Sequence, residues 1–219
     1  MIAEDAPGRE AEQAGLFAGD DPFELILRWL DEAKTSEPND PNAMSLATVD
    51  GAGLPNLRMV LLKEIEGFDA SPKPGGGILF YTNRESAKGT ELDHGLKAAG
   101  LLHWKSLRRQ IRFRGPVERV EDAKSDAYFA SRHPQSRAGA IASQQSRPLD
   151  SRATLIARTE EITDETQGDP KRPANWGGYR IRPVEFEFWA NGEFRLHDRF
   201  VWRRDEPSSD QWKITRLHP

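Results

Sequence analysis

Short apolar runs, each of strand length and each bounded by turn-forming residues, recur along this chain and favour a mainly β fold. Residues 44–49 and 57–62 are two such runs, and the DGAG segment between them is typical of a hairpin turn. Later runs occupy residues 78–82, 101–104, 178–181, 184–189, 194–202 and 212–216. The Asn191-Gly192 pair predicts a tight hairpin turn between two of these later strands.

Residues 110–117 show the alternation of a half-buried strand. Gln110, Arg112 and Arg114 fall on one face, whereas Ile111 and Phe113 fall on the other. Strands expose hydrogen-bonding groups along their edges, and closure into a barrel removes such edges. We therefore predict about seven antiparallel strands in a closed or nearly closed barrel, with helices at its edges.

Helices are predicted at the start and in the middle of the chain. The DPFE segment at 21–24 supplies an N-cap, a proline at the first helical position and a capping-box carboxylate, and residues 23–30 continue with one apolar face. A second helix should begin near Ser86. Residues 121–163 have the pattern of polar helices interrupted at Pro134 and Pro148.

Composition narrows the class of protein. Residues 1–20 have few large apolar side chains and predict a flexible arm, which leaves residues 21–219 as a single domain. Lys and Arg total 31 against 35 Asp and Glu, so the net charge of -4 argues against a nucleic-acid partner. Cysteine is absent, the histidines lack metal-site spacing, and no apolar run approaches the ~18 residues of a membrane span. We therefore expect a cytoplasmic protein without a metal or a membrane partner.

Candidate sites are the polar side chains within the strand runs, because a charge in apolar surroundings is costly unless something pairs with it. The first is RMVLLK at 58–63. A regular strand would put Arg58 and Lys63 on opposite faces, so a shared ligand requires a bulge, a strand end or a subunit interface. The alternative is two edge-strand cations in water.

Four further motifs could bind a ligand. In YTNRESAK at 81–88 a strand gives way to a helix, whose free N–H groups and Lys88 suit a phosphate. RRQ at 108–110 and SQQSRPL at 143–149 can hydrogen-bond the edge of a heteroaromatic ring. In FWANGEFRLHDRF at 188–200, strand alternation places Arg195, His197 and Arg199 on one face, which favours an anion. A solvated strand face is the alternative there.

Taken in this order, the motifs RMVLLK, YTN, RRQ, QS and RLHDR closely resemble those of the pyridoxine (pyridoxamine) 5'-phosphate oxidase family. The match extends from the DPF of the first helix to the closing RLHP, which is similar to the family's RLAP ending. The resemblance implies an antiparallel FMN-binding split β-barrel that acts as a homodimer, with FMN at the subunit interface. It also implies an oxidase that converts pyridoxamine 5'-phosphate and pyridoxine 5'-phosphate to pyridoxal 5'-phosphate in vitamin B6 biosynthesis. O2 would be the electron acceptor, and the products would include H2O2 and, from the amine, NH3.

The resemblance also implies site residues by position. FMN contacts are implied for Arg58, Met59, Val60, Leu61, Leu62, Lys63, Tyr81, Thr82, Lys88, Gln110, Gln145, Ser146, Trp189 and Arg199. Substrate contacts are implied for Lys63, Tyr128, Arg132 and Ser136 at the phosphate and for Arg195, Leu196 and His197 near the pyridine ring. Arg195 and His197 would be the catalytic pair.

The chain departs from the family pattern at two positions. Ala87 stands where the family commonly has an arginine before the phosphate-binding lysine, so one charge-assisted contact to FMN should be missing, with Arg84 as a candidate substitute. Ala11 stands where the substrate-covering RREY segment of the family has its tyrosine.

Two other functions remain open from the sequence. One is a split-barrel FMN oxidoreductase of the flavin reductase type. The presence of the whole substrate set, namely Tyr128, Arg132, Ser136, Arg195 and His197, argues against it. The other is a non-catalytic carrier of pyridoxal phosphate or flavin. Oxygen uptake on adding pyridoxamine 5'-phosphate distinguishes the carrier from the oxidase.

Overall fold

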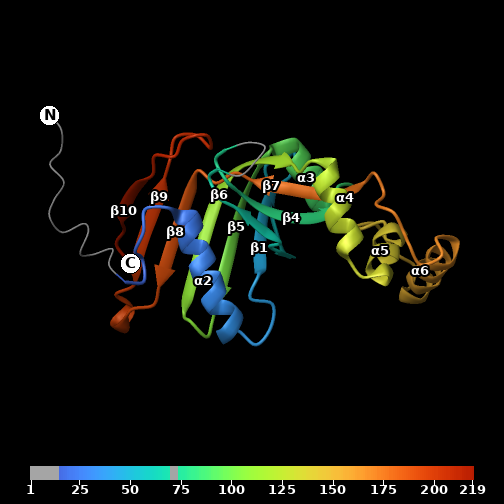
Figure 1. Cartoon of the computed structure of the whole chain (residues 1–219), viewed down its shortest axis with the longest axis horizontal. Coiled ribbons are helices and arrows are strands. Elements are labelled where there is room, and N and C mark those ends of the chain that lie inside the picture. Colours follow the sequence, from blue (N-terminus) through green and yellow to red (C-terminus); the bar gives the residue numbers. More distant parts are fainter. Residues whose placement is uncertain (1–14, 70–73) are drawn as a thin grey trace.

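The structure, a computed structural model, describes residues 15–69 and 74–219. Its strands are β1 (Ala43–Val49), β2 (Pro55–Leu61), β3 (Glu64–Glu66), β4 (Gly77–Asn83), β5 (Lys97–Trp104), β6 (Arg109–Arg119), β7 (Trp176–Ile181), β8 (Glu185–Ala190), β9 (Asp198–Arg203) and β10 (Lys213–Arg216). Its helices are α2 (Pro22–Ser36), α3 (Ala87–Gly95), α4 (Asp122–Ser131), α5 (Pro134–Ala142), α6 (Arg152–Glu165) and the 3-10 turn η1 (Glu193–Arg195). Figure 1 shows the sheet at the centre, α2 across one of its faces, and α4, α5 and α6 together at one end.

The long strand β6 organises the sheet. Residues 109–114 pair with β8, whereas residues 117–119 pair with β7. The order along one path is β10-β9-β8-β6-β5-β1-β2, and β7 continues from β6 to β4 and β3. Gly115 lies between the two pairings, where a Cβ would overlap the carbonyl group of Arg182, so glycine permits the close approach. The antiparallel sheet curls into the predicted split barrel, and in the described part of the chain it has ten strands instead of seven.

The main core lies between α2 and the aromatic side chains of β8. The carboxylate of Asp21 accepts the N–H of Phe23 at 2.8 Å, so α2 begins where the sequence predicts. Phe23 packs edge-on against Phe186 with 5.3 Å between ring centroids, and Trp29 packs against Phe188 at 5.2 Å. Each buried aromatic side chain of this kind contributes ~1.5–3 kcal/mol, which holds the helix on the sheet.

Part of the predicted N-terminal arm belongs to this core. Phe17 is 5% exposed, and its ring centroid lies 4.9 Å from that of Phe200. The indole N–H of Trp29 donates to the carbonyl oxygen of Leu16 at 3.0 Å. The prediction of a flexible arm through residue 20 is therefore wrong for residues 16 and 17, because Phe17 reaches aromatic partners far away in the sequence. Residues 1–14, with the RREY-like segment, lie outside the described residues.

The connection between β8 and β9 differs from the predicted hairpin. Ala190 pairs with Asp198, so residues 191–197 form a loop and not a two-residue turn. Phe194 and Arg195 have positive φ angles of 53° and 66°, which a β-strand does not allow. The strand predicted to begin at residue 194 begins only at Asp198, and the cationic strand face predicted for residues 195–199 does not form.

Helix α3 and the helical segment after residue 121 begin where the sequence predicts. The hydroxyl of Ser86 caps α3 and accepts the N–H of Gly89 at 3.3 Å. The polar segment after residue 121 forms α4, α5 and α6, with Pro134 opening α5 and the segment around Pro148 separating α5 from α6. Of the predicted loop 71–77, only its end is described, and β4 starts at Gly77.

Candidate active site

A cavity of about 570 Å³ opens between the sheet and the α4–α5 pair. Its walls come from the end of β2, from β4, from the first turn of α3 and from α4 and α5. The predicted phosphate ligands Lys63, Tyr128, Arg132 and Ser136 all line it. It is also lined by Met59, Val60, Leu61, Tyr81, Thr82, Lys88 and Gln145 from the predicted FMN set, and by Asn83, Gly139, Ala140, Ser143 and Trp176, which the sequence analysis did not select.

Lys63 reaches the cavity because β2 ends just before it. The N–H of Lys63 donates to the carbonyl oxygen of Leu79 at 2.8 Å, so the chain turns from β2 toward β4. The ammonium group lies 6.0 Å from the ring centroid of Tyr128. Of the three arrangements that the sequence allowed, a strand end therefore brings Lys63 to the cavity. Arg58 points elsewhere, because its guanidinium donates to the carboxylate of Glu91 at 2.7 Å.

Lys88 lines the cavity from the first turn of α3. Its Nζ donates to Oε1 of Gln145 at 3.1 Å, to Oγ of Ser86 at 3.3 Å and to Oγ1 of Thr82 at 3.4 Å. All three acceptors are neutral. Burial lowers the pKa of Lys88, and the nearby charge of Arg58 lowers it further. An ammonium group held by neutral oxygens at a helix N-terminus is suited to bind an anion.

Three stacked aromatic rings form one wall of the cavity. The rings of Tyr81 and Tyr128 lie 4.0 Å apart with 17° between their planes, and Trp176 lies 5.6 Å from Tyr81 at 10°. Burial raises the pKa of Tyr81 to about 12, so its phenol stays protonated at neutral pH. The signal for Trp176 in the sequence was weak, since one tryptophan at a strand start has many possible roles. A flat wall of this kind suits a planar aromatic ligand.

Arg132, the C-cap of α4, has a nitrogen without a partner. Its guanidinium lies 4.9 Å from the ring centroid of Trp176, and its buried Nη1 has no hydrogen-bond partner. Burial also lowers its pKa. Among residues 15–69 and 74–219, none of the ion pairs involves Lys63, Lys88 or Arg132. Lys88 and Arg132 are half-buried and Lys63 is exposed, so a negatively charged ligand in the cavity would pair with cations that have no carboxylate partner of their own.

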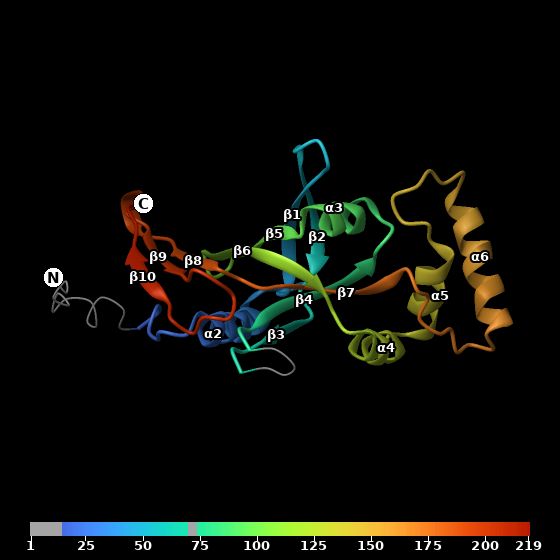
Figure 2. The ribbon, with the colours of Figure 1, turned by 90° about the horizontal axis from the view of Figure 1, so that it is seen from above.

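A second group of predicted contacts lies away from this cavity. Gln110, Trp189 and Arg199 line a hollow of about 320 Å³ on β6, β8 and β9. Glu187, which is 1% exposed, accepts from Nε of Arg199 at 2.9 Å and from Nε of Arg112 at 2.8 Å. Glu187 was not among the predicted contacts, although an acid within the aromatic run EFEFW was a signal for it. Figures 1 and 2 show α4 and α5 at one end of the molecule and β8 and β9 at the other, so one chain presents two separate halves of the predicted site.

The loop 191–197 borders the second half. The ring centroid of His197 lies 4.6 Å from that of Trp189, and its Nδ1 accepts the N–H of Gly192 at 3.2 Å. Leu196 is 70% exposed. The loop thus places His197 beside Trp189, which lines the hollow, through a turn and not through strand alternation.

Some predicted contacts lie outside both groups. Leu62 is 4% exposed within the core. Ser146 lines a different cavity of about 480 Å³, together with Ala87 and Arg147. Arg84, the predicted substitute for the missing arginine, lines none of these cavities and pairs with Asp122 at 3.8 Å.

Residues 15–69 and 74–219 contain neither a cluster of metal ligands nor a helix that could span a membrane. In that part of the chain, no three side chains that could hold a metal ion cluster together. None of the helices described there is long and apolar enough to cross a bilayer.

The fold and the cavity define a class, namely split β-barrel proteins with a cavity lined by cationic side chains beside an aromatic wall. A family model described as pyridoxamine 5'-phosphate oxidase matches residues 30–165. A second model, described as the pyridoxine 5'-phosphate oxidase C-terminal dimerisation region, matches residues 176–219. The chain belongs to the pyridoxamine 5'-phosphate oxidase family.

Individual relatives agree with the family models. The pyridoxine/pyridoxamine 5'-phosphate oxidase of Cereibacter sphaeroides is 59% identical over 208 residues, which cover 95% of this chain and 100% of that protein. PhzG from Burkholderia lata 383, solved with tetrahydrophenazine-1-carboxylic acid, has a TM-score of 0.81 and 32% identity over 92% of this chain and 94% of that one. A pyridoxamine 5'-phosphate oxidase-related, FMN-binding protein of Nostoc punctiforme has a TM-score of 0.71 and 16% identity over 92% and 100% of the two chains, and shows the fold alone.

Proposed function

We propose that this protein is an FMN-dependent oxidase that converts pyridoxamine 5'-phosphate and pyridoxine 5'-phosphate to pyridoxal 5'-phosphate, with O2 as the electron acceptor. The observation that carries the proposal is that Lys63, Lys88 and Arg132, all without carboxylate partners, meet in one cavity with a flat aromatic wall. Ligands that combine a planar ring with a phosphate match both features. The family model and the names of the curated relatives support this reaction.

The cavity fits the phosphate and ring of FMN. Lys88, Thr82 and Gln145 offer polar groups next to the N-terminus of α3, where free N–H groups favour a phosphate. Residues 59–61 and Tyr81 would border the ring. When bound, FMN supplies the redox chemistry, and the protein contributes orientation and electrostatics.

The substrate phosphate is assigned to Lys63, Tyr128, Arg132 and Ser136. Arg132 already has an unpartnered buried nitrogen, so a phosphate oxygen there would complete its hydrogen bonding. Each charge-assisted contact of this type contributes ~1.5–3 kcal/mol. Anchoring the phosphate fixes the position of the substrate carbon that is oxidised. Arg195 and His197 would then orient the pyridine ring and stabilise charge as the reaction proceeds.

We propose that two chains are needed to complete each site. The two halves lie apart within one chain, and the dimerisation-region model covers the half with Trp189, Arg195, His197 and Arg199. In a twofold dimer, the same pair of surfaces meets twice, so each cavity can receive the second half from the partner. Gln110 on β6 lines the same hollow as Trp189 and Arg199, so it would enter the partner's site together with them.

Purified protein tests this function directly. We expect a yellow dimer that releases peroxide with pyridoxamine 5'-phosphate or pyridoxine 5'-phosphate but not with the unphosphorylated compounds. Ligand binding without peroxide would indicate a carrier. Turnover that ignores the phosphate would indicate another split-barrel oxidoreductase.

The division of labour is tested by variants. Arg195→Ala or His197→Ala should lower turnover much more than FMN content, because these residues would face the substrate and not the cofactor. An equal loss of both would contradict the assignment. A single domain, which includes residues 16 and 17 besides the predicted residues 21–219, and a cytoplasmic location are part of the same proposal, and limited proteolysis and cell fractionation test them.

A further inference from the structure

Helix α4 carries two cavity residues but has little apolar surface to hold it in place. It is 10 residues long, and it buries only Ser125 and Phe129. The side chain of its N-cap residue makes no capping hydrogen bond to the first turn. Helices shorter than ~12–15 residues are marginal in water by themselves. Tyr128 near its end and Arg132 at its C-cap line the cavity, so their positions depend on what else fixes α4.

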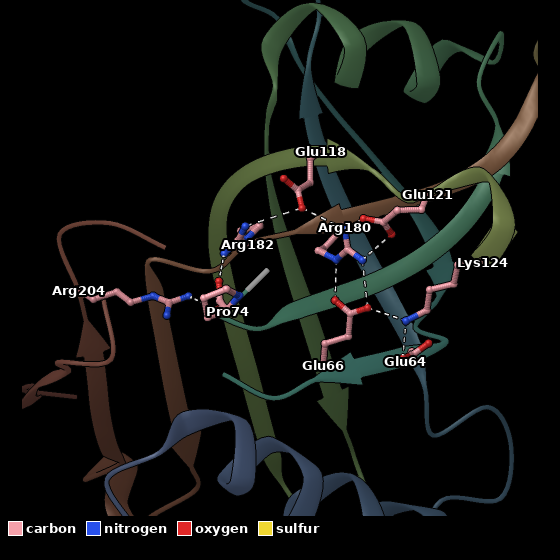
Figure 3. Close-up of polar contacts among 10 residues, drawn as sticks. Glu64, Glu66, Pro74, Glu118, Glu121, Lys124, Arg180, Arg182 and Arg204 are labelled. Atoms are coloured by element: carbon pink, nitrogen blue, oxygen red, sulfur yellow. Dashed lines mark hydrogen bonds and ion pairs between the residues drawn. The ribbon is translucent and has the colours of Figure 1, made fainter. Parts of the chain in front are cut away.

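A group of charges around the buried pair Arg180 and Glu66 ties this helix to the sheet (Figure 3). We call it the α4 charge cluster, and its members are Glu64, Glu66, Glu121, Lys124 and Arg180. Arg180 on β7 donates to both oxygens of Glu66 on β3, at 2.6 and 3.1 Å. It also donates to both oxygens of Glu121, the N-cap of α4, at 3.2 and 3.0 Å. Lys124, within α4, donates to Glu66 at 2.6 Å and to Glu64 at 2.7 Å.

The surroundings of the cluster favour the charged forms. Gly77 lies opposite Glu66, and a Cβ there would come within 2.5 Å of Cγ of Arg180, so glycine makes room for the arginine. Burial alone would raise the pKa of Glu66, but the hydrogen bonds from Arg180 and Lys124 lower it overall. Burial alone would lower the pKa of Lys124, but its two carboxylate partners raise it. These groups therefore remain ionised at neutral pH.

The connectivity links the two sides of the proposed phosphate subsite. Glu64 is the residue directly after Lys63, and Lys124 is one helical turn before Tyr128. The Lys124–Glu64 ion pair thus joins the backbone next to Lys63 to the helix that bears Tyr128 and Arg132. Glu66, 7% exposed, joins the same lysine to Arg180 in the sheet.

We infer that Lys124, with Glu64 and Glu66, is a positioning residue that sets the distance between Lys63 and the α4 residues across the substrate-phosphate subsite. Lys124, Glu64 and Glu66 do not line the cavity, so they would affect the ligand only by holding α4 and β3 in place. The inference rests on the proposed function, since it assumes that Lys63, Tyr128 and Arg132 hold the substrate phosphate. It predicts an effect on substrate affinity and not on the chemical step.

Lys124→Met in the FMN-loaded protein tests this inference. The side chain of Lys124 is 32% exposed, and Glu66 keeps its paired contact with Arg180, so the fold should be retained. We expect KM for pyridoxamine 5'-phosphate and Kd for pyridoxal 5'-phosphate to rise about tenfold, with kcat and FMN affinity unchanged. Lys124→Arg should keep both constants near those of the unchanged protein. Glu64→Gln, which removes the more exposed contact alone, should raise KM less.

The matched control is Lys34→Met, which removes an equal charge from an exposed ion pair with Asp31 on α2. A KM that changes less than about twofold in Lys124→Met, or equally in Lys34→Met, would overturn the inference. So would a fall in kcat and FMN affinity without a change in KM. Tyr128→Phe and Arg132→Met test the substrate-phosphate subsite separately from the positioning role of Lys124. If they leave KM unchanged, the phosphate subsite itself is wrong; if they raise it and Lys124→Met does not, only the positioning role fails.

Discussion

The backbone N–H of Gly192 donates a hydrogen bond to Nδ1 of His197 at 3.2 Å. A ring nitrogen that accepts a hydrogen bond carries no proton, so neutral His197 carries its proton on Nε2. A Cβ at position 192 would overlap the carbonyl oxygen of Leu196, so only glycine allows this loop geometry. The loop therefore presents His197 as a hydrogen-bond donor through Nε2.

This tautomer predicts different outcomes for the two amide replacements of His197. A glutamine amide can place an N–H near the position of Nε2, whereas an asparagine amide lies near Nδ1. We expect His197→Gln to keep about tenfold more turnover than His197→Asn, since it retains one donor of ~1–1.5 kcal/mol. Steady-state kinetics at saturating FMN measure the difference. Equal turnover in the two variants would contradict a role for Nε2 as the donor.

Gly192→Ala should lower turnover while FMN affinity stays the same. The added methyl group moves the Leu196 carbonyl and with it the bond that orients His197. Gly67→Ala is the control, because a Cβ at Gly67 meets no atom within 4 Å. Similar turnover in both glycine variants would show that the Gly192 contact does not orient His197.

Ala87→Arg should tighten FMN binding by about tenfold or more, because one added charge-assisted hydrogen bond contributes ~1.5–3 kcal/mol. Arg84 does not provide that charge, since it pairs with Asp122 and lines neither half of the site. Arg147, which lines the same cavity as Ala87, is the better-placed neighbour. Quenching of FMN fluorescence gives the dissociation constant. If Ala87→Arg changes nothing and Arg147→Met weakens binding, Arg147 already supplies the contact.

Arg180→Met should destabilise the protein by about 3–5 kcal/mol, because it leaves buried Glu66 without its main partner. Urea unfolding monitored by tryptophan fluorescence measures the loss. Arg158→Met, which removes an exposed ion pair with Glu161 on α6, should leave the unfolding midpoint nearly unchanged. A small effect of Arg180→Met would mean that water replaces the lost contacts.

Acid should destabilise the protein through the same carboxylates. The pKa of Glu66 is lowered by hydrogen bonds from Arg180 and Lys124 that outweigh burial, and the pKa of Glu121 is lowered chiefly by Arg180. A depressed pKa in the folded state contributes stability above the ordinary value of 4.5, and that stability is lost as the pH falls through the lower folded value. Urea midpoints measured from neutral to acidic pH should therefore decrease below about pH 5. Glu66→Gln should flatten this decrease, and a midpoint that rises on acidification would contradict it.

The elements predicted correctly from sequence are those that local physics specifies. The Asp21 cap and Pro22 start α2, Ser86 caps α3, and the alternation of residues 110–117 recurs in β6. Each depends on neighbours within a few residues, so the pattern is visible in a short window. The cations in RMVLLK and YTNRESAK were likewise visible, because a charge within an apolar run is unusual whatever the fold.

Tertiary structure alone decided how these pieces meet. Phe17 is buried by Phe200, and Lys124 is ionised beside Glu64 and Glu66, through contacts that join distant parts of the chain. The same holds for the separation of the two half-sites. Residues 194 and 195 have the alternating pattern of a strand but adopt positive φ angles, because the chain must reverse direction between β8 and β9. The order of amino acids determines the conformation that each short segment prefers. The distances between side chains remote in sequence are set only when the sheet curls and brings those segments together.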